Sequence, residues 1–260
     1  MTQPLGRAEL ARPVLQLAPA LLGTVLATRS VGEVVRIRLT EVEAYAGTAD
    51  PASHAFRGRT PRTAVMFGPP GHLYVYFSYG MHWCANVVCD RDGQASAVLL
   101  RAGEVLEGLE AARARRPGCR RDVDLARGPA RLARAAGLDG GDDGLDLCAP
   151  ETRVWLEHAP GSLGPISTGP RVGVNGEGGR ADRYPWRFWL AGEPTVSPYR
   201  AGVPRRGRAG APPPDPAAAS PAGRAGAQPR GDDGIPFRGG TRRGETLPDA
   251  TSEDPAEGLG

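Results

Sequence analysis

Apolar residues recur at helical spacing near the start of the chain and in strand-like runs further along. Residues 14–22 have the helical spacing, and Gly23 would end that helix. Four runs rich in β-branched, aromatic or other apolar residues predict strands at residues 34–46, 73–79, 81–89 and 95–102. Gly80 separates two of these runs and predicts a turn.

The segments that follow add helices and short strands. Residues 105–116 and 128–137 place Leu and Ala on one face and predict helices. Residues 153–156 and 186–190 predict two further strands. Because strands recur without regular helices between them, the pattern favours an antiparallel or mixed β-sheet over a doubly wound one. The predicted fold class is α+β, with one sheet flanked by helices in a single domain.

From residue 198 onward the chain is rich in Pro, Gly and Arg and poor in large apolar side chains. Such a segment cannot bury enough apolar surface to offset the entropy cost of ordering it. We therefore expect a folded domain over residues 1–197 and a disordered tail over residues 198–260. Arginine clusters in the tail could contact nucleic acid, but a similar number of acidic residues favours a solvated linker.

Charge and cysteine content narrow the possible functions only slightly. The formal net charge of +3 neither requires nor excludes a nucleic-acid partner, and the absence of lysine makes every basic residue an arginine. The four cysteines form no Cys-x-x-Cys pair and have no histidine at zinc-ligand spacing, so we expect reduced thiols, no metal and no cofactor. Without a long apolar run or a targeting segment, we expect a cytoplasmic protein with no membrane contact.

Acidic side chains alternate along the first predicted strand. Alternation places Glu41, Glu43 and Tyr45 on one face, with Thr40, Val42 and Ala44 on the other. In a shielded pocket, one such carboxylate could act as a general base toward water. The other interpretation is the solvated polar face of a half-exposed strand.

Histidine and arginine follow in a loop that contains Gly and Pro. His54 lies within reach of the acidic strand, although a single histidine is more often a surface or capping residue. Arg57, Arg59 and Arg62 are spaced closely enough to suit phosphate contacts, and a solvated loop is the alternative.

Three of the six tyrosines lie within residues 74–79. Tyr74 and Tyr76 share the strand face opposite Leu73, Val75 and Phe77, so the tyrosines would line a groove where a phenol can stack and hydrogen-bond. Tyr79 comes at the predicted hairpin tip. It could act as an aromatic wedge between base steps, or it could pack at a strand end.

These residues form an ordered series of motifs. The series is EVEAY at residues 41–45, SHA at 53–55, TPR at 60–62, MFGPPG at 66–71, LYVYF at 73–77, YGMHWCANVV at 79–88, AVLLRA at 97–102, GPARL at 128–132 and RVGV at 171–174. Together they closely resemble the bacterial members of the 3-methyladenine DNA glycosylase family, the alkyladenine DNA glycosylases. The resemblance covers roughly residues 13–192.

The resemblance implies a single-domain α+β fold with a curved antiparallel sheet. It also implies hydrolysis of the N-glycosidic bond of alkylated purines after the nucleotide has been flipped out of duplex DNA. By position, Glu43 matches the general base that activates water, and Arg101 matches the arginine that helps to hold this water. The Val172 backbone corresponds to a second contact to the water.

Other positions match the base pocket and the DNA-facing surface of the family. Asn86 corresponds to the residue that disfavours the 2-amino group of guanine, and Met81 lies beside the tip residue that fills the gap left by the flipped nucleotide. The full set is Tyr45, His54, Tyr76, Asn86 and Val172 for the base pocket, Tyr79 and Met81 for intercalation, and Arg57, Arg59 and Arg62 for the DNA backbone.

The expected function is therefore a monomeric DNA glycosylase that starts base excision repair. Cationic alkylpurines are good leaving groups that stack on electron-rich rings, so 3-methyladenine and 7-methylguanine are the expected substrates, with ethenoadenine and hypoxanthine as further candidates. Because no lysine amine is available for a Schiff base, we expect a monofunctional enzyme. The alternatives are a non-catalytic nucleic-acid-binding protein and a carbohydrate glycosidase built on Glu41 and Glu43.

Overall fold

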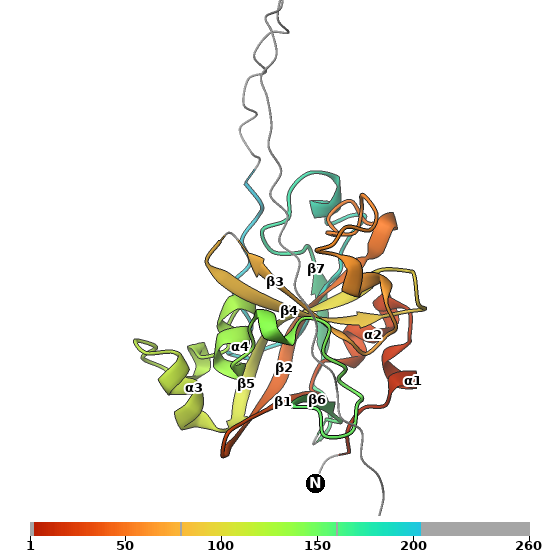
Figure 1. Cartoon of the computed structure of the whole chain (residues 1–260). Helices are drawn as coiled ribbons and strands as arrows, with labels where there is room; N and C mark the ends of the chain where they lie inside the picture. Colours follow the sequence, from red (N-terminus) through yellow and green to blue (C-terminus); the bar gives the residue numbers. More distant parts are fainter. Residues whose placement is uncertain (1–2, 79, 160, 204–260) are drawn as a thin grey trace, which may run out of the picture. The chain divides into compact units, whose positions relative to one another are not determined.

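One antiparallel sheet of eight strands organises the protein (Figure 1). The structure, a computed structural model, describes residues 3–78, 80–159 and 161–203. The strands are β1 (Val25–Ser30), β2 (Glu33–Ala46), β3 (Leu73–Ser78), β4 (His82–Cys89), β5 (Ser96–Glu107), β6 (Val154–Glu157), β7 (Ile166–Gly169) and β8 (Arg187–Leu190). Their order is β3-β4-β5-β2-β1-β6, and β8 pairs with both β2 and β7. Every pairing between these strands is antiparallel, which confirms the α+β class and decides between the two predicted sheet types.

Strand β2 is the centre of the sheet. One edge pairs with β5 along most of its length, while the other edge pairs first with β1 and then, at Glu41–Glu43, with β8. Irregular register near residues 39–42 interrupts the β5 ladder. At Glu41 and Glu43 the strand has neighbours on both edges, and the side chains of both acids are fully buried. The interpretation of this segment as a solvated polar face is therefore wrong.

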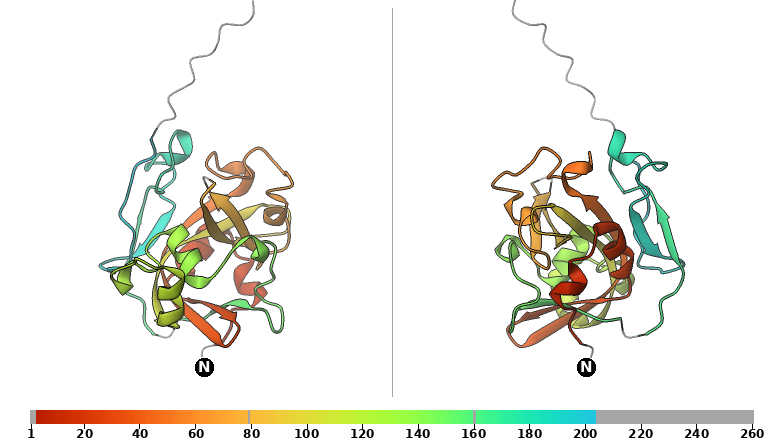
Figure 2. Two further views of the ribbon diagram at one scale, coloured as in Figure 1. Left: turned by 60° about the vertical axis from the view of Figure 1, so that its left-hand side comes forward. Right: turned by 90° about the vertical axis from the view of Figure 1, so that its right-hand side faces the viewer.

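Four short helices flank the sheet. They are α1 (Arg7–Leu10), α2 (Val14–Ala20), α3 (Leu109–Arg115) and α4 (Pro129–Ala136). Short 3-10 turns add η1 (Gly47–Ala49), η2 (Ala64–Phe67), η3 (Asp122–Asp124), η4 (Gly140–Asp142) and η5 (Glu177–Gly179). Proline opens α4 at its first turn, and Gly137, with a φ of 71°, ends it in the left-handed region. Figure 1 shows α3 and α4 at one end of the sheet and α1 and α2 at the other, and Figure 2 gives two further views of this arrangement.

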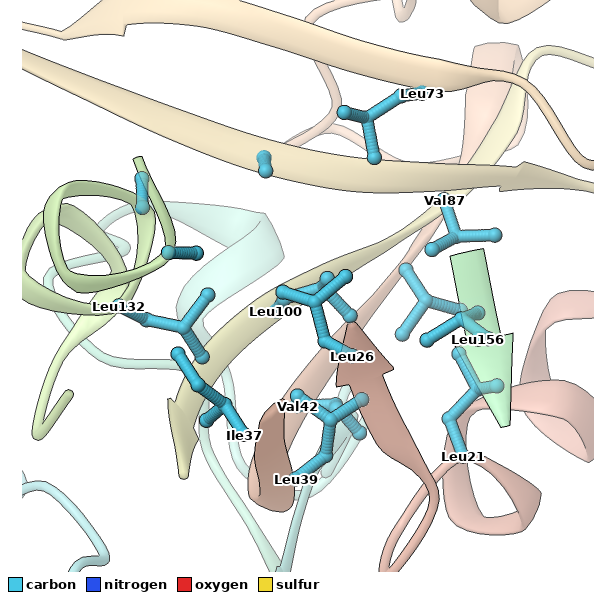
Figure 3. Packing of buried hydrophobic residues seen from close by; sticks show 14 of the residues in the cluster. Leu21, Leu26, Ile37, Leu39, Val42, Leu73, Val87, Leu100, Leu132 and Leu156 are labelled. Atoms are coloured by element: carbon cyan, nitrogen blue, oxygen red, sulfur yellow. The ribbon is translucent and has the colours of Figure 1, made fainter. Parts of the chain in front are cut away.

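Aliphatic side chains from the sheet and the helices make one continuous core. Figure 3 shows Leu26, Val42 and Leu100, from three neighbouring strands, close to one another in this core. Leu132 of α4 and Leu21, which follows α2, are also fully buried. Truncation of such a leucine to alanine costs about 2–5 kcal/mol of stability. Packing of the helices against this core therefore stabilises the central strands, which include the strand that carries Glu41 and Glu43.

The predicted helix over residues 105–116 is wrong at its start. Strand β5 continues to Glu107, where Val105 pairs with Ile37 of β2. Gly108 then takes a φ of 75°, and a Cβ there would lie 2.4 Å from the Val34 carbonyl oxygen. Helix α3 begins only after this turn. Residues 105–107 form a strand despite their helical pattern, because they pair with the long strand β2.

Most other predicted elements are confirmed within a few residues, whereas β1 and β7 were not predicted. Strand β1 begins two residues after Gly23, and its first four residues are buried. Two predictions involve undescribed residues: the Tyr79 tip, and most of the predicted tail. Residues 198–203 of that tail are described, and within them Arg200 O accepts a hydrogen bond from Gly173 N at 2.8 Å. Within the described part of the chain, no helix is long and apolar enough to cross a membrane.

Candidate active site

A pocket of about 750 Å³ is lined by residues of β2, β3, β4 and β5 and by loops. Its wall contains seven of the residues that the sequence indicated for catalysis or base binding, together with Arg62. The lining is Glu43, Tyr45, Pro51, Ala52, Ser53, His54, Arg62, Met66, Tyr74, Tyr76, Phe77, Ser78, Cys84, Asn86, Leu99, Arg101, Pro129, Val172, Gly173, Val174 and Asn175. The site thus collects residues from four strands, from the start of α4 and from loops distant in sequence.

Two hydrogen bonds and one ion pair hold the Glu43 carboxylate in this pocket. Val172 N donates to Oε1 at 2.7 Å, and Tyr45 Oη donates to Oε2 at 2.9 Å. Arg101 Nη1 lies 3.3 Å from Oε1. Burial, followed by the nearby Glu43 charge, raises the pKa of Tyr45 well above its usual value, so this phenol remains a donor. A buried carboxylate held in this way has a fixed orientation, as a general base requires.

Glu41 belongs to a different environment from Glu43. Its Oε1 accepts from Arg101 Nε at 3.0 Å and from Arg187 Nε at 2.6 Å. Ser197 donates to it twice, from the backbone N to Oε2 at 2.8 Å and from Oγ to Oε1 at 3.0 Å. Glu41 is not among the residues that line the pocket. With four donors and no pocket surface, Glu41 can position Arg101 but cannot reach a ligand in the pocket.

A second buried ion pair, between Asp50 and Arg171, lies next to the residues that donate to Glu43. Arg171 donates to both carboxylate oxygens of Asp50, at 2.5 and 2.8 Å, and neither side chain has exposed surface. Its guanidinium also lies 4.6 Å from the centroid of the Tyr45 ring. Because Arg171 directly precedes Val172, this ion pair fixes the position of the Val172 N–H, which donates its hydrogen bond to Glu43. Arg171 stands in the RVGV motif, but the sequence alone indicated no role for it.

Aromatic side chains form another part of the pocket wall. The Tyr74 and Tyr76 rings are stacked with centroids 5.6 Å apart, and His54 meets Tyr76 edge-on at 4.5 Å. His54 Nδ1 and Tyr74 Oη are 3.1 Å apart, a contact that the sequence did not predict. Burial by the pocket wall, with a smaller effect from the Arg62 charge, lowers the pKa of His54 to about 4 although its outer edge is exposed. The histidine is therefore neutral at pH 7 and presents a hydrogen-bonding edge without charge.

Asn86 and Cys84 complete the inner part of the pocket. Asn86 Nδ2 donates to the Tyr74 carbonyl oxygen at 3.0 Å, which fixes the amide against the neighbouring strand. Burial is the largest cause that raises the pKa of Cys84, so it remains a thiol. All four cysteines are free. No group of three metal-ligating side chains occurs among the described residues.

The residues indicated for DNA contact are those expected to intercalate and those expected to contact the DNA backbone. Met81, beside the β3–β4 turn, has 66% of its surface exposed, whereas Tyr79 lies outside the described residues. Arg57 and Arg59 are exposed. Neither side chain forms an ion pair with another described residue. Arg62 is exposed as well, but it also lines the pocket, with its guanidinium 5.4 Å from the Tyr76 ring centroid.

Comparison with known proteins supplies independent information. The sequence model of the methylpurine-DNA glycosylase (MPG) family matches residues 8–194. A protein of Streptomyces avermitilis is 56% identical over 207 residues, which are 79% of this chain and 96% of the relative. Relatives from Leifsonia xyli subsp. xyli and Burkholderia lata are 55% and 49% identical, covering 77% and 74% of this chain and 94% and 90% of their own lengths. Each of the three bears the name "Putative 3-methyladenine DNA glycosylase".

Proposed function

The chain belongs to the methylpurine-DNA glycosylase family, and we propose that it excises alkylated purines from duplex DNA by using a water molecule activated by Glu43. As a member of this family it is a hydrolase of N-glycosyl bonds that acts on DNA. One observation supports the finer proposal above all others. A buried carboxylate held by two hydrogen bonds and one ion pair lines a pocket that stacked aromatic rings also line.

In the proposed reaction, Glu43 takes a proton from water while the water oxygen bonds to C1′ of the sugar. The electron pair of the C1′–N9 bond passes to the departing purine. Val172 N and Tyr45 Oη keep the carboxylate oriented, and Arg101 helps to hold the water. Glu41 acts only through Arg101, as a positioning residue.

Base flipping is part of the proposal because C1′ is inaccessible inside the duplex. The stacked Tyr74 and Tyr76 rings, with Tyr45 on the side of Glu43, provide flat surfaces for a purine. Asn86 would disfavour the 2-amino group of normal guanine. Tyr79 and Met81 would occupy the vacated position in the stack, and the exposed Met81 side chain supports this role.

Further proposals concern the organisation of the chain. We propose that residues 1–197 form the catalytic domain, that residues 198–260 lie beyond it, and that the protein acts as a cytoplasmic monomer. Hydrogen bonds from Gly173 N to Arg200 O and from Asn175 Nδ2 to Val203 O extend ordered contacts six residues past that boundary. A functional truncation should therefore retain residues 198–203.

Turnover on damaged DNA tests this function against its strongest alternative. The experiment incubates trace duplex containing 7-methylguanine with excess protein and measures the released base and the abasic sites. The proposal predicts first-order release of the base, with one abasic site formed for each base. Saturable binding to the same duplex without any released base would instead favour a non-catalytic nucleic-acid-binding protein.

A further inference from the structure

Three aromatic rings surround the guanidinium of Arg171. Its central carbon lies 4.6 Å from the centroid of the Tyr45 ring, 5.2 Å from that of Trp186 and 5.7 Å from that of Tyr184. The Tyr184 and Trp186 rings also meet edge-on, with centroids 4.8 Å apart. We call Tyr45, Tyr184 and Trp186 the aromatic cage. Because Tyr45 belongs to β2 and the other two rings precede β8, the cage joins two distant parts of the chain.

Oxygen atoms occupy the edges of the same guanidinium. Nη1 donates to Ala44 O at 2.8 Å and to Asp50 Oδ2 at 2.5 Å, and Nη2 donates to Asp50 Oδ1 and Gly178 O, both at 2.8 Å. Nε has no hydrogen-bond partner among the described residues, and Arg171 is fully buried. Where water is excluded, aromatic rings can stabilise a guanidinium across its faces, which hydrogen bonds in its plane do not reach.

The backbone of Trp186 is attached to the strand that carries Glu43. Its carbonyl oxygen accepts a hydrogen bond at 2.9 Å from the N–H of Ala44, the residue directly after Glu43 on β2. The next residue, Arg187, is the partner of Glu43 in the antiparallel register of β2 and β8. The Trp186 ring therefore meets Arg171 from a backbone position that β2 holds in place.

The cage is connected to the Glu43 carboxylate through two hydrogen bonds. Arg171 directly precedes Val172, whose N–H donates to Glu43 Oε1 at 2.7 Å. Tyr45, which forms one side of the cage, donates its phenol proton to Glu43 Oε2 at 2.9 Å. A shift of Arg171 would therefore disturb both donors. General base catalysis depends on the orientation of the carboxylate toward the water, so such a shift would slow the reaction.

We propose that Trp186 and Tyr184 are positioning residues for excision, because they enclose Arg171 and so maintain the two donors that orient Glu43. This inference rests on the proposed glycosylase function. Neither Trp186 nor Tyr184 lines the base pocket, so neither ring contacts a flipped base. Their loss should consequently slow the chemical step without an equal loss of lesion binding.

The first comparison removes or retains the ring at position 186. Trp186→Leu removes the aromatic face but leaves an apolar side chain, whereas Trp186→Phe retains a ring. Trp155→Leu is the matched control, because the Arg29 guanidinium lies 5.1 Å from the centroid of the Trp155 ring and neither residue lines the pocket. Tyr184→Leu removes the more distant ring of the cage. Single-turnover excision of 7-methylguanine, binding of the same duplex and urea unfolding are measured for every variant.

The second comparison asks whether Trp186 acts through Arg171. Its background is the double variant Asp50→Asn with Arg171→Met, which removes both charges of the ion pair so that neither is left buried alone. Trp186→Leu is introduced into wild type and into this background. The resulting double-mutant cycle isolates the coupling between the ring and the ion pair.

Trp186→Leu should slow excision about tenfold or more, with lesion binding near wild type, because the donors to Glu43 shift while the pocket keeps its lining. Trp186→Phe should recover most of this loss, and Tyr184→Leu should cause a smaller one. In the background without the ion pair, Trp186→Leu should change the rate by less than about twofold. Trp155→Leu should leave excision unchanged.

Three results would overturn the inference. They are excision at the wild-type rate by Trp186→Leu, an equal loss with and without the ion pair, and a loss that weaker lesion binding explains completely. The second of these is the result that a purely structural role predicts. If Trp186→Leu does not fold, Tyr184→Leu decides the question in the same cycle. A wild type that binds the duplex but releases no base would refute the glycosylase function itself, and this inference with it.

Discussion

Glu41 accepts a hydrogen bond from Arg101, with 3.0 Å between Oε1 and Nε. The same guanidinium lies 3.3 Å from Glu43, so Arg101 bridges two fully buried carboxylates. Arg187 and Ser197 supply the remaining donors to Glu41. Two acids that look equivalent along strand β2 therefore have separate tasks, since one faces the pocket and the other holds the arginine beneath it.

Replacing Glu41 should damage stability and positioning together. The Glu41→Ala substitution leaves Arg101 and Arg187 buried without this partner, which should cost about 3–5 kcal/mol of unfolding free energy. The neutral, isosteric Glu41→Gln should cost less and slow excision while lesion binding stays near wild type. Urea unfolding measures the first effect, and single-turnover kinetics with binding titrations measures the second. Wild-type excision by a folded Glu41→Gln variant would remove Glu41 from the positioning network.

The Asp50–Arg171 pair should be as sensitive as the Glu41 network. In Asp50→Asn, Arg171 loses its charged partner in a fully buried position, and a loss of about 3–5 kcal/mol is expected. Excision should fall as well, because the Val172 N–H and the Tyr45 ring both depend on Arg171. Asp182→Asn is a suitable control, since it disrupts an exposed ion pair with Arg180. A similar stability loss in both variants would contradict the special role of the buried pair.

His54 should make stability depend on pH in the acidic range. Its pKa is about 4 in the folded protein and 6.5 in the reference state, so between these values only the unfolded chain binds the proton. Unfolding is then favoured as pH falls, and stability rises as pH increases from about 4 to 6.5. Urea midpoints at pH 5 and pH 7 should differ less in His54→Gln than in wild type. An equal difference in both proteins would show that His54 does not contribute.

The product of the reaction should be an intact strand with an abasic site. No lysine exists in the chain, so a Schiff base with the sugar has no side-chain amine available. Excision followed by gel analysis without alkali should give full-length strand, and alkali should then cleave it. Strand cleavage without alkali, together with a borohydride-trapped protein–DNA adduct, would disprove this expectation.

Local patterns were sufficient for part of the site. Alternation in β2 and β3 placed Glu43 with Tyr45 and Tyr74 with Tyr76, because the side-chain period of a strand is fixed by backbone geometry. The resemblance supplied Arg101, Asn86 and Val172, which no local pattern connects to Glu43. All of these line one pocket.

The supporting contacts could not be found in this way. Arg187 and Ser197 reach Glu41 only because β8 pairs with β2, and Asp50 meets Arg171 across a loop. The helical pattern at residues 105–107 was overridden for the same reason, since pairing with β2 outweighs local propensity. Tertiary contacts of this kind have no periodic signal in the sequence.

The assignment of Glu43 can be tested by single-turnover excision of 3-methyladenine with wild type, Glu43→Gln and Glu41→Gln. Glu43→Gln keeps the size and hydrogen-bonding capacity of the side chain but cannot take a proton from water. The account predicts lesion binding near wild type, with excision lowered by about 10²–10⁴-fold, and a smaller loss for Glu41→Gln. Excision at the wild-type rate by Glu43→Gln would contradict the proposed mechanism.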